Sequence, residues 1–307
     1  MARVFAITLN TFREAVRDRV LYGVFGFASA VLFFTLALSE LALHEQRRVV
    51  TDVGLASISL FSVLIAIFLG SSLLYKEIER KTLYVILPKP ISRTEFLLGK
   101  YFGIVVTALV FVALMGALQL WLSAVSAGAS TWTALAVLIG LGALFGVQLW
   151  LARDRTLSLV PFAAVALLAV SLLAARTDAE LEHILAQLVL CVIEVLVLAA
   201  VALLFSSFST PFLTGMFTLG IWVLGRSADD MATIKSKSIG EGLRQILRVA
   251  SEVLPNLQLY VPGRTLLSGQ SKVALWPYVA TSTGYGVLYA ALMLVCAAFI
   301  FQRRDFL

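Results

Sequence analysis

The sequence predicts an all-α polytopic membrane protein with about eight transmembrane helices. The chain has 307 residues, of which 60% are hydrophobic, and its mean hydropathy is +0.96. A soluble domain is only about half apolar, so this composition would leave much apolar surface in contact with water. Apolar runs of 18 or more residues recur, and each can cross a hydrocarbon core of about 30 Å as a helix. The strict alternation of a membrane β-barrel is absent, which favours helices.

Residues 1–19 form the first expected element, an amphipathic helix. Phe5, Leu9, Phe12 and Val16 recur at spacings of four, three and four residues, while basic side chains lie on the other side. Such a helix can lie along the membrane surface. The alternative is that this segment simply extends the first span into the cytosol.

Eight apolar segments follow as candidate spans. The fourth and fifth are among the shortest and follow each other, so they could instead form a re-entrant pair and leave six full crossings. Either count is even, which places both termini on the same side of the membrane. The segments are roughly 20–40, 53–75, 101–126, 133–151, 157–175, 184–205, 210–226 and 278–301.

The distribution of basic residues orients these spans. With the N-terminus in the cytosol, 14 of the 24 Lys and Arg residues fall in cytosolic segments and only 3 in the short outer loops. This bias is the one that the positive-inside rule requires, so both termini are expected to be cytosolic. The basic isoelectric point then reflects topology and contact with membrane lipids rather than binding of nucleic acid.

Motifs for catalysis and for nucleotide or metal binding are absent from the sequence. There is no phosphate-binding G-x-x-x-x-G-K-[ST] loop and no Cys/His spacing of a zinc site. Cys191 and Cys296 both lie in predicted spans, so no disulfide framework is indicated. We therefore expect no catalytic residue, no metal site and no cofactor bound by this chain.

Residues 75–101 hold nine charged side chains between two apolar runs. A helical pattern over 77–87 ends at Pro88 and Pro90, because proline disfavours a continuing helix. Ser92 then begins a second helix, and Glu95 stands three residues later, as in a capping box. The sequence therefore predicts a stiff connection on the cytosolic side.

The stretch E-R-K-T-L-Y-V-I-L-P-K-P-I-S-R-T-E-F-L-L-G-K resembles the signature of the membrane subunit of type-2 ABC exporters. Lys81 stands where this family usually has glycine. Segments 12–22, 202–215, 255–269 and 301–306 also resemble family segments, whereas about 130–178 does not and is expected to be an inserted helix pair. The signature positions that match are Glu79, Thr82, Leu83, Leu87, Pro90, Ile91, Ser92, Arg93, Gly99 and Lys100.

The resemblance implies a single transmembrane domain over 1–307, with a six-span core plus the inserted pair, in a bacterial inner membrane. It implies pairing with a second copy and with two copies of a separate ATPase subunit, which would bind ATP and Mg. Residues 76–100 would form the coupling region, with Pro88, Pro90, Ser92 and Arg93 shaping it. The expected ATPase contacts are Glu77, Glu79, Arg80, Thr82, Leu83 and Leu87.

A long outer segment, 226–277, precedes the last span. Apolar residues in 239–254 recur at broadly helical spacing, and Pro255 follows them. This pattern predicts a short helix on the outer face, and the alternative is a plain surface loop. The segment could dock an outer accessory protein.

Glu194 is the only carboxylate deep within a predicted span. Gln187, Cys191 and Glu194 fall at i, i+4 and i+7, so they form one polar stripe on a helix. A carboxylate inside a membrane is costly and is expected to face the bundle interior or to pair. The stripe could line a translocation pathway, or it could serve helix–helix packing, for example with Gln119 or Gln148.

Three functions remain open from the sequence. The first is an ATP-driven permease that exports an unidentified substrate. The second is a related subunit that passes conformational change to an outer partner without moving a solute. The third, an ion-coupled secondary transporter, is disfavoured because the sequence shows no internal repeat and no matched pair of broken helices.

Overall fold

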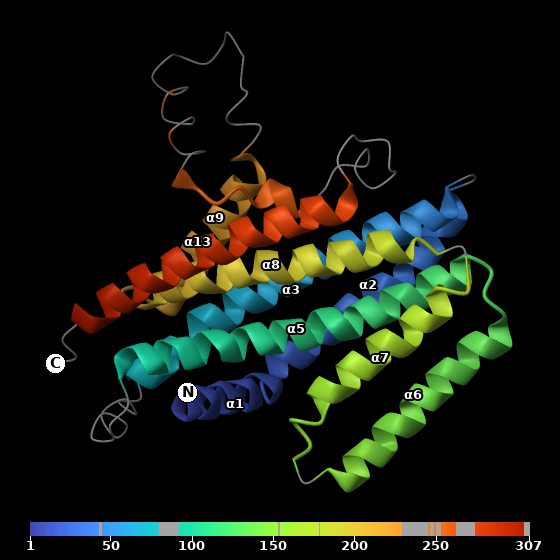
Figure 1. Ribbon diagram of the computed structural model, residues 1–307, viewed down its shortest axis with the longest axis horizontal. Coiled ribbons are helices and arrows are strands. Elements are labelled where there is room, and N and C mark those ends of the chain that lie inside the picture. Colours follow the sequence, from blue (N-terminus) through green and yellow to red (C-terminus); the bar gives the residue numbers. More distant parts are fainter. Residues whose placement is uncertain are drawn as a thin grey trace. The chain divides into compact units, whose positions relative to one another are not determined.

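A computed structural model describes residues 1–42, 45–79, 92–152, 154–177, 179–228, 245, 249, 253–261 and 274–303, with the side chains of 73–79 excepted. All regular secondary structure in these residues is helical (Figure 1). The helices are α1 (Ala2–Val16), α2 (Arg19–Leu41), α3 (Gln46–Glu79), α5 (Arg93–Ser126), α6 (Thr131–Leu151), α7 (Leu159–Ala174), α8 (Leu181–Ser206), α9 (Pro211–Arg226), η1 (Leu257–Tyr260) and α13 (Leu275–Arg303).

Every predicted span coincides with one of these helices, and the predicted all-α polytopic membrane protein is confirmed. Within the described ranges, six helices are long and apolar enough to cross a membrane: α2, α3, α5, α6, α8 and α13. Helices α7 and α9 have 16 residues each. At 1.5 Å per residue they reach only about 24 Å, which is less than a hydrocarbon core of about 30 Å. The two short helices are thus α7 and α9, whereas the re-entrant alternative expected the short pair to be α6 and α7.

The N-terminal helix α1 is separated from the first span. It ends at Val16, and the Asp18 carboxylate caps the start of α2 by accepting a hydrogen bond from the Val20 N–H at 3.0 Å. The apolar face of α1 buries Phe12 and Val16 in a cluster with Val110 of α5 and Ala163 of α7. The N-terminal segment is therefore a helix of its own with an anchored apolar face.

The chain forms two compact units. One comprises Met1–Ile7, Ala66–Phe102 and Ile193–Leu307, and the other comprises Thr8–Ile65 and Gly103–Val192. Helices α1, α3, α5 and α8 each contribute a segment to both units. The first unit holds α9, η1 and α13, while the second holds α2 and the hairpin of α6 and α7 (Figure 1).

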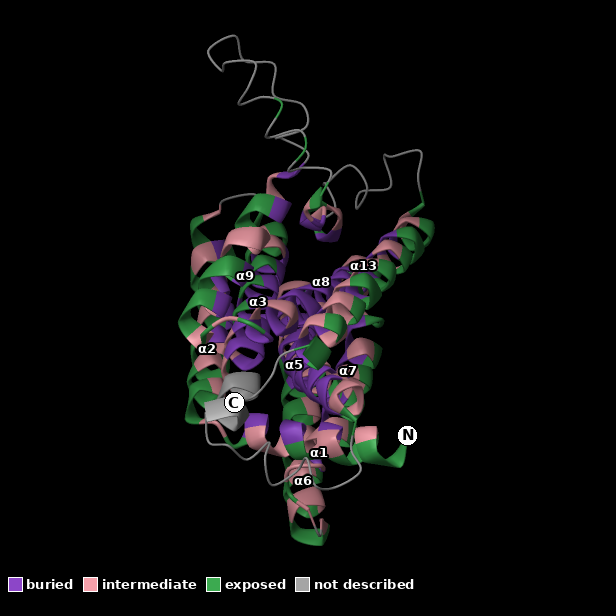
Figure 2. Cartoon of the chain, turned by 90° about the vertical axis from the view of Figure 1, so that its left-hand side faces the viewer, coloured by how far each residue is buried: buried purple, intermediate pink, exposed green. Residues whose placement is uncertain are grey.

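Burial differs sharply between the spans. Of the 18 consecutive residues that form the apolar part of each helix, 72% are buried in α8 and 6% in α6 (Figure 2). The side chains of α6 are nonetheless strongly apolar, and Ala134 is its one buried residue. An apolar helix with so little covered surface can be stable only where lipid or another apolar surface replaces water.

Gly103 provides a test of how α1 packs. A Cβ atom at Gly103 would lie 2.4 Å from Thr11 Cβ, while one at Gly142 of α6 meets nothing within 4 Å. We therefore expect Gly103→Val to lower the free energy of unfolding by about 1–3 kcal/mol through overpacking. The matched Gly142→Val variant should stay within about 0.5 kcal/mol of the parent. Thermal unfolding of both detergent-purified proteins measures the difference, and equal losses would contradict this packing.

Candidate functional site

The described residues cover only part of the predicted coupling region. Glu77 and Glu79 lie in the last turns of α3, and their side chains are not described. Arg80, Thr82, Leu83, Leu87, Pro88 and Pro90 lie outside the described residues. Their expected contacts with an ATPase subunit therefore stay predictions, and the described site begins at Ser92.

Ser92 and Glu95 form both hydrogen bonds of the predicted capping box at the start of α5. The Glu95 N–H donates to Ser92 Oγ at 3.2 Å, and the Ser92 N–H donates to Glu95 Oε2 at 3.0 Å. These bonds satisfy amide groups that have no partner within the helix. The end of the connection is thereby fixed to the first turn of α5.

Arg93 joins the start of α5 to the end of α13. Its Nη1 atom donates to the carbonyl oxygens of Phe301 at 3.3 Å and Gln302 at 2.9 Å. Both carbonyls belong to the last turn of α13, where backbone acceptors lack partners within the helix and the helix dipole is negative. A guanidinium group satisfies both requirements at once, so Arg93 clamps the end of α13.

Aromatic stacking reinforces this clamp. The rings of Phe96 and Phe301 lie 6.4 Å apart between centroids and are inclined by 15°. The Lys100 ammonium lies 5.8 Å from the Phe96 ring centroid, and its side chain is buried. We call this set, Ser92, Arg93, Phe96, Phe301 and Gln302, the α5–α13 junction.

The beginning of α1 packs beside the same turn of α5. A Cβ atom at Gly99 would lie 2.6 Å from Ile7 Cβ and 3.2 Å from the Val4 carbonyl oxygen. Only glycine allows this close approach between the two helices. The first turns of α1 are thereby held next to the α5–α13 junction.

Loss of the Ser92 cap should act locally. Removing an N-cap hydroxyl costs about 1 kcal/mol, so Ser92→Ala should raise amide exchange in the first turn of α5 roughly fivefold. Ser92→Thr keeps the hydroxyl and should leave exchange near the parent level. Hydrogen exchange followed by mass spectrometry over residues 92–98 measures this, and unchanged exchange in Ser92→Ala would contradict the observed cap.

Glu194 of α8 is completely buried and forms an ion pair with α9. Arg226 Nη2 donates to Oε1 at 2.8 Å and to Oε2 at 2.9 Å, and Arg226 Nε donates to Oε1 at 3.0 Å. Trp222 Nε1 also donates to Oε1 at 3.0 Å, and the Arg226 guanidinium lies 5.5 Å from the Trp222 ring. Two nitrogen atoms of the Arg226 guanidinium and the indole nitrogen of Trp222 thus donate hydrogen bonds to the carboxylate.

This geometry shows how a charged carboxylate is retained inside an apolar helix bundle. A bidentate guanidinium supplies both charge and directional hydrogen bonds. From the sequence, Gln119 or Gln148 on a neighbouring span was one expected partner of the polar stripe. In the structure, Arg226 and Trp222 donate hydrogen bonds to Glu194. Gln187 and Cys191, the other members of the predicted stripe, are also buried on α8. A role for the stripe in translocation stays a prediction.

Three tyrosines of α13 hold residues 253–261, which are a described part of the predicted outer segment, 226–277. Each tyrosine hydroxyl bonds to a backbone group of these residues, so the hydrogen bonds fix the path of the main chain. Tyr278 donates to the Leu259 carbonyl at 2.6 Å, Tyr289 donates to the Val253 carbonyl at 3.3 Å, and Tyr285 accepts from the Asn256 N–H at 3.1 Å.

Two glycines allow the outer segment to approach α9 and α13. A Cβ atom at Gly225 would lie 2.6 Å from the Pro255 carbonyl oxygen, and one at Gly286 would lie 2.5 Å from Tyr260 Oη. Pro255 itself lies in non-helical backbone, as expected for a helix stop. Most of the predicted helix over 239–254 lies outside the described residues.

Residues 35–139 match the family described as ABC-2 membrane transporter related. This part of the chain is of the ABC-2 permease kind. The predicted resemblance is thus confirmed over a range that includes the signature stretch, and the family implies an ATPase partner. A search of curated proteins finds no match.

The matched range covers the second and third predicted spans and the connection between them. It begins within α2 and ends within α6, so it includes α3 and α5. Helix α7 and most of the expected inserted pair lie beyond it. Together with six helices that can cross a membrane, the match supports a multi-pass membrane transporter subunit of ABC type.

Arg226, Trp222 and the three tyrosines were not singled out from the sequence. Arg226 lies at the boundary between a predicted span and the outer segment, where a basic residue is not unusual. The signal that could have found it is the need of Glu194 for a cation on a neighbouring helix end. No local pattern indicates the tyrosine contacts, because their partners are backbone groups.

Proposed function

We propose that this chain is the permease subunit of an ATP-driven ABC exporter, pairing with a second copy of itself and with two ATPase subunits. The ATPase subunits bind ATP and Mg and contact the connection at 76–100 from the cytosol of a bacterial cell. Both termini are cytosolic in this arrangement, and the membrane is the inner membrane. The observation that carries the proposal is the α5–α13 junction, at the end of the stretch with the family signature.

The junction gives the connection a mechanical route into the bundle. A displacement of residues 76–91 reaches α5 through the capping box of Ser92 and Glu95. Arg93 then passes it to the end of α13 through the Phe301 and Gln302 carbonyls. Packed helices move as rigid bodies, so the motion is carried along the 29 residues of α13.

A second function is favoured by the opposite end of α13. Its tyrosines hold the outer segment by backbone hydrogen bonds, so a shift of α13 also moves residues 253–261. A subunit built in this way could transmit ATP-driven motion to an outer accessory protein without moving a solute. The two functions share the same inner mechanism and differ in what the outer segment acts on.

Purification with its natural partners tests the proposal. The chain is tagged, expressed in its native host and purified in mild detergent, and the eluate is assayed for Mg-dependent ATP hydrolysis. A variant with Glu79→Arg, Arg80→Glu and Thr82→Asp changes the expected contact surface. The control, Arg47→Glu with Arg48→Glu, reverses the charge of two neighbouring arginines at the start of α3.

We expect the parent and the control to carry an ATPase subunit and the contact variant to lose it. An ATPase that stays bound to the contact variant would place the interface elsewhere, contrary to the proposal. A chain that purifies alone and catalyses gradient-driven flux in liposomes would establish a secondary transporter instead. An outer-compartment protein in the same eluate would favour the second function over export.

A further inference from the structure

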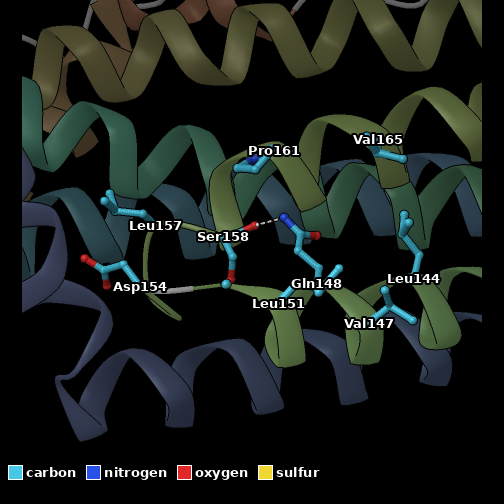
Figure 3. A pocket seen from close by; sticks show the side chains of 10 residues that line it. Leu144, Val147, Gln148, Leu151, Asp154, Leu157, Ser158, Pro161 and Val165 are labelled. Carbon is cyan, nitrogen blue, oxygen red and sulfur yellow. Dashed lines mark hydrogen bonds between the residues drawn. The ribbon is translucent and has the colours of Figure 1, made fainter.

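The α6–α7 hairpin contains an open apolar cavity of about 650 Å³ near the loop that joins the two helices (Figure 3). This volume is within the range of about 300–1,000 Å³ that is usual for ligand sites. Both helices belong to the same compact unit, so the cavity is formed within that unit. Most of its walls are aliphatic side chains, including Leu144, Val147, Leu151, Leu157 and Val165.

Gln148 places a hydrogen-bond acceptor in this apolar wall. Its Nε2 atom donates to the Ser158 carbonyl at 2.8 Å. Because a backbone carbonyl only accepts hydrogen bonds, this contact assigns the amide nitrogen to the side of Ser158 and the amide oxygen to the other side. In Figure 3 the Gln148 oxygen points away from Ser158, on the side where Leu144 and Val165 lie. Among the residues that the structure describes, none donates a hydrogen bond to this oxygen.

The other polar side chains that line the cavity already have partners. The Asp154 carboxylate forms an ion pair with Arg13, so its charge does not call for a charged ligand. The Ser158 hydroxyl donates to the Arg155 carbonyl at 2.7 Å. Gln148 Oε1 is therefore the side-chain acceptor that is available to a ligand of this cavity.

An amide oxygen without a donor in an apolar wall limits the ligands that the cavity can hold. A pure hydrocarbon would fill the cavity but leave the oxygen without a hydrogen bond, which costs free energy. Esters and ethers add only acceptors, and an anionic group would lack a cation, because Arg13 is paired with Asp154. A neutral molecule with a hydrocarbon body and a hydroxyl group satisfies both the walls and the amide oxygen.

We propose that the α6–α7 cavity binds a neutral lipid alcohol, a molecule with a long hydrocarbon body and a hydroxyl group. The hydroxyl donates to Gln148 Oε1, and the hydrocarbon packs against aliphatic side chains of both helices, such as Leu144 and Val165. The bound molecule joins α6 to α7 beside the Gln148–Ser158 hydrogen bond. All the lining residues lie beyond the range that matches the permease family, so the site does not depend on the proposed export function.

Photolabelling of the full chain tests this site. The protein is reconstituted into phosphatidylcholine nanodiscs, whose lipid has no hydroxyl donor, and is labelled with hexadecanol that carries a diazirine in its chain. Unlabelled hexadecanol or its methyl ether is added as competitor, and mass spectrometry of peptides from residues 144–165 measures the labelling. The two competitors share the same hydrocarbon, but only the alcohol can donate a hydrogen bond.

Three variants separate the amide from the apolar walls. Gln148→Leu removes the acceptor at a similar side-chain size, and Val147→Trp fills the cavity. The matched control, Ile139→Trp, adds the same ring at another exposed position of α6. The comparison of alcohol with ether in the parent needs no substitution, so the test does not depend on how the variants fold.

We expect the alcohol to compete about fivefold better than the ether in the parent, which is the effect of one hydrogen bond. In Gln148→Leu the two competitors should become equal. Val147→Trp should lose most of the labelling of residues 144–165, and Ile139→Trp should keep it. Equal competition by alcohol and ether in the parent, a preference that persists in Gln148→Leu, or unchanged labelling in Val147→Trp would overturn the proposal.

Discussion

Arg226→Met is expected to lower the free energy of unfolding by about 3–5 kcal/mol, because it leaves the buried Glu194 carboxylate without its cation. Glu194 is 0% exposed, and Arg226 donates three hydrogen bonds to its carboxylate while Trp222 donates one. Trp222 alone cannot compensate a negative charge, since an indole N–H is one neutral donor. Thermal unfolding of the detergent-purified protein measures the loss.

The double variant Glu194→Gln with Arg226→Met separates the charge from the packing. A neutral amide can still accept the Trp222 hydrogen bond, and replacing both partners of a buried ion pair is often close to neutral. We therefore expect the double variant to recover most of the stability that Arg226→Met loses. A double variant as unstable as Arg226→Met would show that the guanidinium acts through packing rather than charge.

The same pair tests the translocation hypothesis for Glu194. Glu194→Gln alone leaves Arg226 without its carboxylate, but 24% of the Arg226 side chain is accessible, so water can solvate its charge. We therefore expect Glu194→Gln to be tolerated better than Arg226→Met. Normal abundance and full activity of the assembled transporter in Glu194→Gln would exclude a role of the carboxylate in translocation. Normal abundance with lost activity would support that role.

Features that depend on adjacent residues could be predicted from the sequence. The spans follow from long apolar runs, and the Ser92–Glu95 capping box follows from a four-residue pattern. The turn between α8 and α9 begins after Ser206, and Pro211 opens α9, as the resemblance of segment 202–215 implied. Each of these features depends on the backbone hydrogen bonds and conformation of one short segment, and the residues of that segment determine them.

Features that join distant segments could not be predicted in this way. Arg93 and Gln302 are 209 residues apart, and Glu194 and Arg226 are 32 apart, so their contacts depend on how helices pack. The tyrosines of α13 bind backbone carbonyls and an amide, which every residue carries. Sequence thus indicated that Glu194 needs a partner and that Ser92 starts a helix. It did not indicate that the next residue, Arg93, holds the end of the last span.

Arg93→Ala is expected to abolish ATP-driven movement of α13 while leaving the ATPase subunit bound. Under the proposed function, the side chains that contact the ATPase lie within residues 77–87 of the connection, and Arg93 lies beyond them on the route to α13. Its loss removes two hydrogen bonds from a charged donor, each worth about 1.5–3 kcal/mol. The Phe96–Phe301 stack remains, so α13 should stay in place, but without the Arg93 hydrogen bonds it should no longer follow α5.

Spin labels can report this movement without a known substrate. Trp276, near the start of α13, is 48% exposed, and Trp276→Cys in a background without Cys191 and Cys296 gives one label per subunit. In a complex with two copies, pulsed electron paramagnetic resonance measures one distance between the labels. We expect this distance to change between the nucleotide-free and the ATP- and vanadate-trapped states of the parent.

Arg303→Ala is the matched control for this experiment. Arg303 belongs to the same turn of α13 and lies 4.1 Å from the Phe299 ring, so its removal also deletes one positive charge at that helix end. We expect the distance change to persist in Arg303→Ala and to vanish in Arg93→Ala, with equal amounts of ATPase bound in both. If Arg93→Ala keeps the full distance change, α13 must receive its motion through another contact. If Arg93→Ala loses the ATPase subunit, Arg93 belongs to the interface itself rather than to the route beyond it.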